Sequence, residues 1–173
     1  MWFNFLLVML LVICVITDIR ERKIYNKVIF PTLIIAFLSH LLLGGSKDLF
    51  SSVIGFFVGF LILFVPYLLG GMGAGDVKLL ALIGALKGSY FVLHSSIYMA
   101  IAGGLMAFIL LIFQKQLHTT LKSLYYYIYN LKYGIRLPSL INNNDLSNTY
   151  PYGTAIATGA IINLLLEGGL HLW

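Results

Sequence analysis

The chain has 173 residues, of which 60% are hydrophobic and only 10% are charged, and its mean hydropathy is +0.95. This composition excludes a soluble globular domain and predicts an all-α integral membrane protein, because a helix satisfies its own backbone hydrogen bonds in lipid. The net charge of +5 does not indicate nucleic-acid binding, because the basic residues flank apolar segments. We expect a single membrane domain over residues 1–173.

The first apolar segment runs from Trp2 to Thr17 and is followed by Asp18. No basic residue precedes it and no small-residue cleavage site follows it, so we expect a retained first helix and not a signal peptide. Cys14 is the single cysteine of the chain, which excludes an internal disulfide and a Cys-x-x-Cys zinc site.

Apolar segments predict a bundle of about six transmembrane helices. In chain order these are Trp2 to Thr17, Val28 to Leu43, Ser51 to Leu69, Val77 to Leu86, Tyr90 to Phe113 and Thr154 to Leu170. The fourth has only ten residues, which at about 1.5 Å per residue cover about 15 Å of a hydrocarbon core of roughly 30 Å. We therefore expect this short helix to be buried among the others and to begin in a wet, protein-lined pocket.

A glycine-rich turn, Gly70 to Gly75, leads directly into Asp76 and the fourth segment. Glycines remove side chains from the approach to the carboxylate and permit positive φ angles, so another backbone can come close to Asp76. The alternative is that these glycines only allow tight packing of helices in the membrane.

The polar segment 114–151 separates the fifth and sixth apolar segments. Apolar residues recur in it at spacings of three and four from Leu117 to Leu131, which predicts an amphipathic helix in the headgroup region before the last span. A substrate-docking surface is the alternative interpretation.

The basic residues predict the topology. If the segments alternate sides, nine of the eleven lysines and arginines share one face, and only Lys47 and Lys87 lie opposite. The positive-inside rule places the nine in the cytoplasm, so both termini are expected outside a cytoplasmic membrane. The same count puts Asp18, Asp76 and the segment 114–151 on the cytoplasmic side.

Two of the six acidic residues stand out, because Asp18 closes one apolar helix and Asp76 opens another at the same predicted face. Ionisable groups at membrane depth are candidates for function, and two carboxylates in one pocket can share a proton. One then acts as a base towards water while the other protonates a carbonyl, as peptide hydrolysis requires. The alternative is that both are ordinary helix-end residues.

The segments around these acids resemble the type IV prepilin peptidase family. Three stretches carry the resemblance: Thr17-Asp18 with Arg20, Lys23, Ile24 and Asn26; Gly73-Ala74-Gly75-Asp76 followed by Val77-Lys78-Leu79-Leu80; and Pro151-Tyr152-Gly153. The resemblance implies an intramembrane aspartyl endopeptidase with Asp18 and Asp76 as catalytic residues. Such an enzyme cuts the leader from prepilin-like proteins, after a glycine and at the cytoplasmic membrane border, so prepilin-like proteins and the lipid bilayer are the expected partners.

The chain departs from the larger members of that family, which carry paired Cys-x-x-Cys motifs and also methylate the new N-terminus. It resembles the short, peptidase-only form, and it has no S-adenosylmethionine fingerprint. No cofactor is expected. No metal is expected either, because the four histidines are scattered and form no His-Glu-x-x-His pattern.

Roles can be assigned to the remaining candidate residues. Gly73 and Gly75 are expected to admit the extended substrate backbone, and Lys78 is expected either to reach the headgroups or to hold substrate. The resemblance alone implies that Asn26 and Tyr152 orient groups in the pocket. Because Asp76 begins a helix and Asp18 ends one, Asp76 is predicted to be the base.

Two other classes of function fit parts of the pattern. A small proton-coupled transporter or channel could use the two aspartates as a relay. A structural subunit of a secretion machine would need neither acid.

Overall fold

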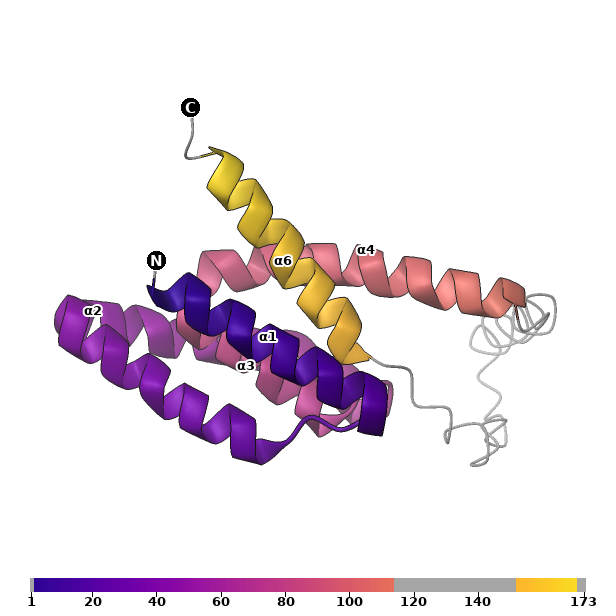
Figure 1. The fold of residues 1–173 in the computed structure, drawn as a ribbon, viewed down its shortest axis with the longest axis horizontal. Coiled ribbons are helices and arrows are strands. Elements are labelled where there is room, and N and C mark those ends of the chain that lie inside the picture. The colour runs from indigo at the N-terminus through magenta and orange to yellow at the C-terminus, as the bar shows by residue number, and fades with distance from the viewer. Residues whose placement is uncertain (1, 114–151, 171–173) are drawn as a thin grey trace, which may run out of the picture. The chain divides into compact units, whose positions relative to one another are not determined.

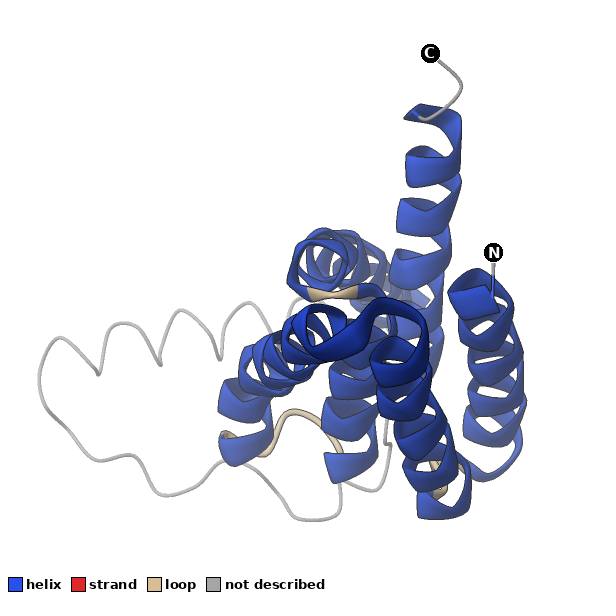
Figure 2. Ribbon diagram, turned by 90° about the vertical axis from the view of Figure 1, so that its left-hand side faces the viewer, coloured by secondary structure: helices blue, strands red, loops and turns tan. Residues whose placement is uncertain are grey.

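The computed structural model describes residues 2–113 and 152–170 (Figure 1). In these residues the chain forms five helices and no strand (Figure 2): α1 (Trp2–Glu21), α2 (Asn26–Leu68), α3 (Ala74–Lys87), α4 (Ser89–Phe113) and α6 (Tyr152–Leu170). One compact unit comprises residues 1–103 and 151–173, and a second comprises residues 104–150. The amphipathic helix predicted within 114–151 lies outside the described residues.

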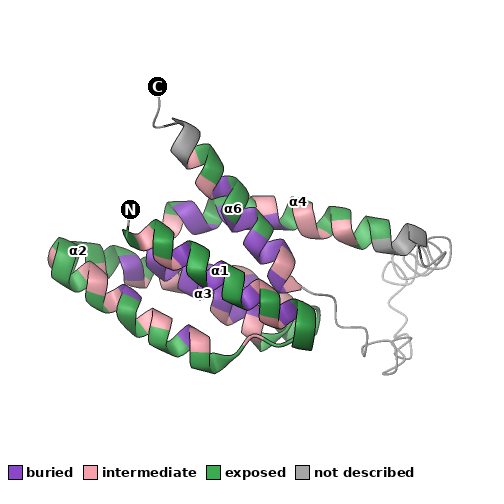
Figure 3. Cartoon of the chain, in the orientation of Figure 1, coloured by how far each residue is buried: buried purple, intermediate pink, exposed green. Residues whose placement is uncertain are grey.

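The helices confirm an all-α membrane protein. Three stretches are long and apolar enough to cross a membrane: Trp2–Glu21, Asn26–Leu68 and Ser89–Ile109 of α4. Many large apolar side chains on α1, α2 and α4 are exposed (Figure 3). Exposed apolar surface of this extent is expected to face lipid.

The prediction of six separate spans is not confirmed, because the described residues contain three stretches that are long and apolar enough to cross a membrane. The second and third predicted segments both fall within α2. This helix is interrupted at Gly45, whose φ of 73° is readily available only to glycine. Phe37 and Phe56 lie on either side of the interruption, with ring centroids 6.2 Å apart. A straight helix would separate them by about 28 Å. The chain therefore reverses at Gly45, and the two halves of α2 pack side by side.

Helix α3 forms the core of this unit, as expected for the short fourth segment. It has 14 residues, and all of Leu79 to Leu86 is buried. Gly55 and Gly59 of α2 face Gly84 and Leu80 of α3 so closely that a Cβ atom at Gly55 or Gly84 would overlap the backbone of the other. The Gly-x-x-x-Gly spacing in α2 is typical of helices whose backbones approach each other in membranes.

Replacing Gly84 with alanine is expected to destabilise the protein, because the new methyl group would overlap the Gly55 carbonyl. Overpacking of this kind costs about 1–3 kcal/mol, which corresponds to a fall in melting temperature of roughly 5 °C. Thermal unfolding in detergent measures the change. The control is Gly104→Ala in α4, where no heavy atom lies within 4 Å of the added Cβ. Equal melting temperatures for the two variants would contradict this account of the α2–α3 contact.

The contact between α6 and α4 is polar as well as close. Asn163 is 5% exposed and donates from Nδ2 to the carbonyl of Phe91 at 3.0 Å and to Oγ of Ser95 at 3.2 Å. A Cβ atom at Gly159 would lie 2.6 Å from the carbonyl oxygen of Ser95. These interactions hold the first half of α4 against α6, whose N-terminus reaches the candidate active site.

Candidate active site

Asp18 lies in the last turn of α1, where the chain is about to leave the helix. The backbone amide of Arg22, which has a left-handed φ of 51°, donates to the Asp18 carbonyl oxygen at 2.9 Å and ends the helix. The Asp18 side chain is only 5% exposed. Its Oδ2 atom is buried and has no hydrogen-bond partner of good geometry among the described residues. A buried carboxylate oxygen without a partner is expensive in a purely structural site and is a feature of sites that bind or react.

The N-terminus of α6 meets this carboxylate. The backbone amides of Gly153 and Thr154 act on the Asp18 carboxyl group as hydrogen-bond donors. A Cβ atom at position 153 would lie 2.7 Å from Oδ2 and 2.9 Å from Cγ of Asp18, so only glycine lets the helix start approach so closely. The free amides of a helix N-terminus favour an anion, and α6 therefore supplies a partly positive environment for Asp18.

Asp76 lies in the first turn of α3 and is 8% exposed. Its Oδ2 accepts a hydrogen bond from the Gly73 amide at 3.1 Å, and its own amide donates to the Gly73 carbonyl oxygen at 3.1 Å. Asp76 is outside the three candidate spans. Burial raises the pKa of Asp76 to about 6, although the Gly73 amide opposes this rise and the negative charge of Asp18 adds to it.

The structure thus brings Asp18 and Asp76 into one buried region. They come from the end of α1 and the start of α3, and the charge of one acts on the pKa of the other. Two carboxyl groups that interact in this way titrate as a pair, and one proton can be shared between them.

Two further candidates are also brought together. The Lys78 Nζ atom donates to the Asn26 side-chain oxygen at 2.9 Å and lies 5.8 Å from the ring centroid of Phe30. The interaction joins the start of α2 to the first turns of α3, next to the buried Asp76. Tyr152 is the first residue of α6 and is partly buried.

The two glycines of the turn have different surroundings. Gly73 holds the Asp76 carboxylate through its amide, as described above. A Cβ atom at Gly75 would lie 3.0 Å from the Ile24 side chain, in the connection between α1 and α2. Close packing within the chain therefore explains Gly75, and its predicted contact with substrate remains a prediction.

Comparison with protein families matches residues 5–116, more than half of the chain, to the type IV leader peptidase family. The chain belongs to this family. The match contains both aspartates together with Asn26 and Lys78, whereas Pro151-Tyr152-Gly153 lies beyond it. Membership of the type IV leader peptidase family and the apolar helices together identify a membrane-bound peptidase of the prepilin type. No curated protein and no solved structure matches the chain.

Two features of the site were missed in the sequence. Gly153 belongs to the stretch Pro151-Tyr152-Gly153 that resembles the family, and nothing in the order of residues indicates that it touches Asp18. The prediction that Asp76 is the base depends only on the helix to which each aspartate belongs. Because the N-terminus of α6 also meets Asp18, both carboxylates lie at helix N-termini, and the reason for that assignment is lost.

The raised pKa of Asp76 predicts a pH-dependent stability. The pKa is about 6 in the folded protein, against about 3.9 in an unfolded chain. The folded protein therefore binds the Asp76 proton more tightly than the unfolded chain does. The free energy of unfolding is highest below about pH 4 and falls as the pH rises through about 6. The loss is on the order of 3 kcal/mol. Asp76→Asn removes the buried charge, so it is expected to raise the melting temperature at pH 8 and to leave it nearly unchanged at pH 4.

The measurement is thermal unfolding in detergent at the two pH values. The control is Glu21→Gln, which changes an exposed carboxylate that accepts a hydrogen bond from the Tyr25 hydroxyl. A gain in Asp76→Asn of the same size at pH 4 and pH 8 would show that the charge of Asp76 is not what destabilises the fold.

Proposed function

We propose that the chain is an intramembrane aspartyl endopeptidase that cleaves the leader peptide from prepilin-like substrates at the cytoplasmic face of the membrane. The observation that carries this proposal is the pair of buried, interacting carboxylates, Asp18 and Asp76, in a member of the type IV leader peptidase family. No observation favours the proton-relay alternative.

The two carboxyl groups supply a base and an acid. Burial disfavours the anion of both groups, but two amides at the start of α6 donate to Asp18, whereas Asp76 accepts from the Gly73 amide alone and is further opposed as an anion by the charge of Asp18. The proposed roles are therefore the reverse of those expected from the sequence, with Asp18 as the base. At neutral pH the pair holds fewer protons than at pH 6, so cleavage is expected to fall as the pH rises above about 6.

Hydrolysis proceeds in two steps in this arrangement. The Asp18 carboxylate takes a proton from water while the water oxygen attacks the scissile carbonyl carbon and Asp76 gives its proton to the carbonyl oxygen. In the resulting diol, the amide nitrogen takes the proton from Asp18, the C–N bond breaks and Asp76 regains a proton from a hydroxyl group. The pair returns to its starting state without a cofactor.

The substrate must present an extended peptide to this pair. A helical carbonyl is already hydrogen-bonded and poorly exposed to attack, so the substrate helix has to unwind locally. The proposed binding groups are Gly73, Gly75, Lys78, Asn26 and Tyr152. The positively charged leader remains in the cytoplasm by the same rule that gives the topology, with both termini of the enzyme outside.

Reconstitution tests the proposal. The full chain in liposomes is given a substrate with a basic leader that ends in glycine, followed by an apolar helix, and the product masses locate the scissile bond. Cleavage after the glycine is expected, and it should be insensitive to metal chelators and to serine-directed inhibitors. Inhibition by a chelator, or cleavage elsewhere, would contradict the proposed chemistry.

A further inference from the structure

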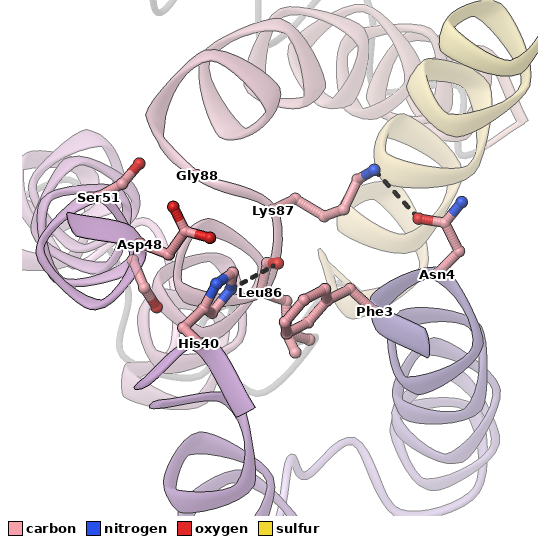
Figure 4. Close-up of a pocket in the computed structure, with 9 residues that line it drawn as sticks. Phe3, Asn4, His40, Asp48, Ser51, Leu86, Lys87 and Gly88 are labelled. Atoms are coloured by element: carbon pink, nitrogen blue, oxygen red, sulfur yellow. Dashed lines mark hydrogen bonds between the residues drawn. The ribbon is translucent and has the colours of Figure 1, made fainter. Parts of the chain in front are cut away.

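A polar cavity lies at the opposite end of α3 from Asp76. Its volume is about 500 Å³, and its lining comes from the start of α1, both halves of α2 around the reversal at Gly45, and the C-terminus of α3. Figure 4 shows His40, Asp48 and Ser51 contributed by α2, and Lys87 extending from the end of α3 towards Asn4 of α1. None of these residues takes part in the candidate active site.

Two polar side chains of this region bind the last carbonyl groups of α3. The Ser52 hydroxyl donates to the Ala85 carbonyl oxygen at 2.5 Å, and Nε2 of His40 lies 3.2 Å from the Leu86 carbonyl oxygen. The last carbonyls of a helix have no partner within it, so these two side chains satisfy α3 where it ends inside the protein. The His40 ring also stacks on Phe3, with centroids 4.1 Å apart. Ser52 and His40 are thereby explained without a ligand.

The charge of Asp48, an exposed residue, is not explained in this way. Asp48 has no hydrogen-bond or ion-pair partner among the described residues, although it lines the cavity. The Lys87 ammonium donates to Asn4 Oδ1 at 3.1 Å, pairs with Glu167 Oε2 at 3.3 Å and lies 4.9 Å from the ring centroid of Phe91. One of its three N–H donors has no hydrogen-bond acceptor among the described residues. The cavity therefore offers an anionic group on α2 and a cationic group with a donor to spare on α3. A ligand that carries both charges would satisfy both.

The position of the cavity indicates where such a ligand comes from. Two exposed aromatic residues are close in sequence to residues that line the cavity. Trp2, which is 51% exposed, precedes Phe3, and Tyr90, which is 81% exposed, follows Gly88 by two residues. Leu42 and Leu43 on α2 are 77% and 71% exposed. Aromatic residues beside apolar surface at the ends of membrane helices are typical of the bilayer interface, where lipid headgroups lie. We therefore infer that the cavity opens at the depth of the lipid headgroups.

We propose that this cavity binds the headgroup of a zwitterionic aminophospholipid, of the phosphatidylethanolamine type. The primary ammonium group donates to the Asp48 carboxylate and the Ser51 hydroxyl, and the phosphate accepts from Lys87. A purely anionic headgroup, such as phosphatidylglycerol, brings no cation to Asp48. A choline headgroup has the charge but no N–H donor for a hydrogen bond.

Binding is measured with the full chain in a non-ionic detergent after removal of co-purified lipid. The probes are short-chain phosphatidylethanolamine, phosphatidylcholine and phosphatidylglycerol, together with free phosphoethanolamine. Because only its headgroup donates a charged hydrogen bond to Asp48, phosphatidylethanolamine is expected to bind roughly tenfold more tightly than the other two lipids. Free phosphoethanolamine is expected to bind more weakly than the lipid, because it lacks the acyl chains that lie against α2.

Matched variants identify the site. Asp48→Asn keeps the size of an exposed side chain and removes its charge, so it is expected to weaken phosphatidylethanolamine binding about tenfold. Ser51→Ala is expected to weaken it less, and Lys47→Gln, at an exposed lysine outside the lining, is the control. The readout does not depend on peptidase activity, so its result is separate from that of the cleavage assay.

Three results would overturn the proposal. Equal affinity for phosphatidylethanolamine and phosphatidylglycerol would exclude recognition of the ammonium group. Unchanged binding in a correctly folded Asp48→Asn variant would exclude this cavity. Affinity for free phosphoethanolamine equal to that for the lipid would place the ligand in solution and exclude a bilayer source.

Discussion

Replacing either Asp18 or Asp76 with asparagine is expected to abolish leader cleavage. Each variant keeps the shape of the side chain but loses either the base or the acid, and general acid–base groups contribute about 10²–10⁴-fold each. Because the two groups act as a unit, the double variant should be hardly slower than either single variant. Initial rates on a reconstituted prepilin-like substrate measure the effect.

The control for this experiment is Glu21→Gln, an exposed carboxylate in the same turn of α1 as Asp18. It should retain nearly full activity. Residual activity in one aspartate variant would be informative about roles, because activity surviving only in Asp76→Asn would support Asp18 as the base. Nearly full activity in both single variants would rule out the aspartyl mechanism.

Gly153→Ala is expected to lower kcat about 100-fold, because small errors in the position of a catalytic group have effects of this size. Its Cβ atom would lie 2.7 Å from Oδ2 of Asp18, so either the carboxylate or the start of α6 must move. The KM should change little, since Gly153 acts through Asp18 and is not proposed to bind substrate. The pH profile of kcat should also shift, because the amides of α6 no longer face the carboxylate as before.

Gly103→Ala provides the matched control. Gly103 of α4 also faces α6, but its added Cβ would meet the Ala155 Cβ at 3.6 Å, an ordinary contact. Both variants should unfold at temperatures close to that of the parent. Equal losses of activity in the two variants, or a rise in KM alone for Gly153→Ala, would contradict a positioning role for Gly153.

Local patterns in the sequence predict much of the fold. Apolar segments indicate the helices, and the shortness of the run from Val77 to Leu86 predicts a buried helix, because a helix that cannot cross the bilayer has to pack inside the protein. The resemblance around Asp18 and Asp76 predicts the family to which the chain belongs. Each of these inferences depends on residues that are neighbours in the sequence.

The remaining features depend on contacts between distant segments. The reversal at Gly45 separates the two halves of α2, and the contact between Phe37 and Phe56 shows that these halves lie side by side. The cavity that Asp48 shares with Lys87 is not predictable from local patterns, because it requires the reversal of α2 near Gly45 to meet the C-terminus of α3. The Gly-x-x-x-Gly spacing of Gly55 and Gly59 was a local signal for the α2–α3 contact, but it does not identify the partner helix.

The length of α3 has a consequence for the depth at which substrate is cut. Its 14 residues extend about 21 Å, against a hydrocarbon core of roughly 30 Å. Asp76 is eleven residues before Lys87, so when Lys87 lies at one edge of the core, Asp76 lies about 13 Å inside the other edge. Water must then enter the hydrocarbon core from that side to reach Asp76. A substrate must likewise be drawn several residues into the core before its scissile bond meets the two aspartates.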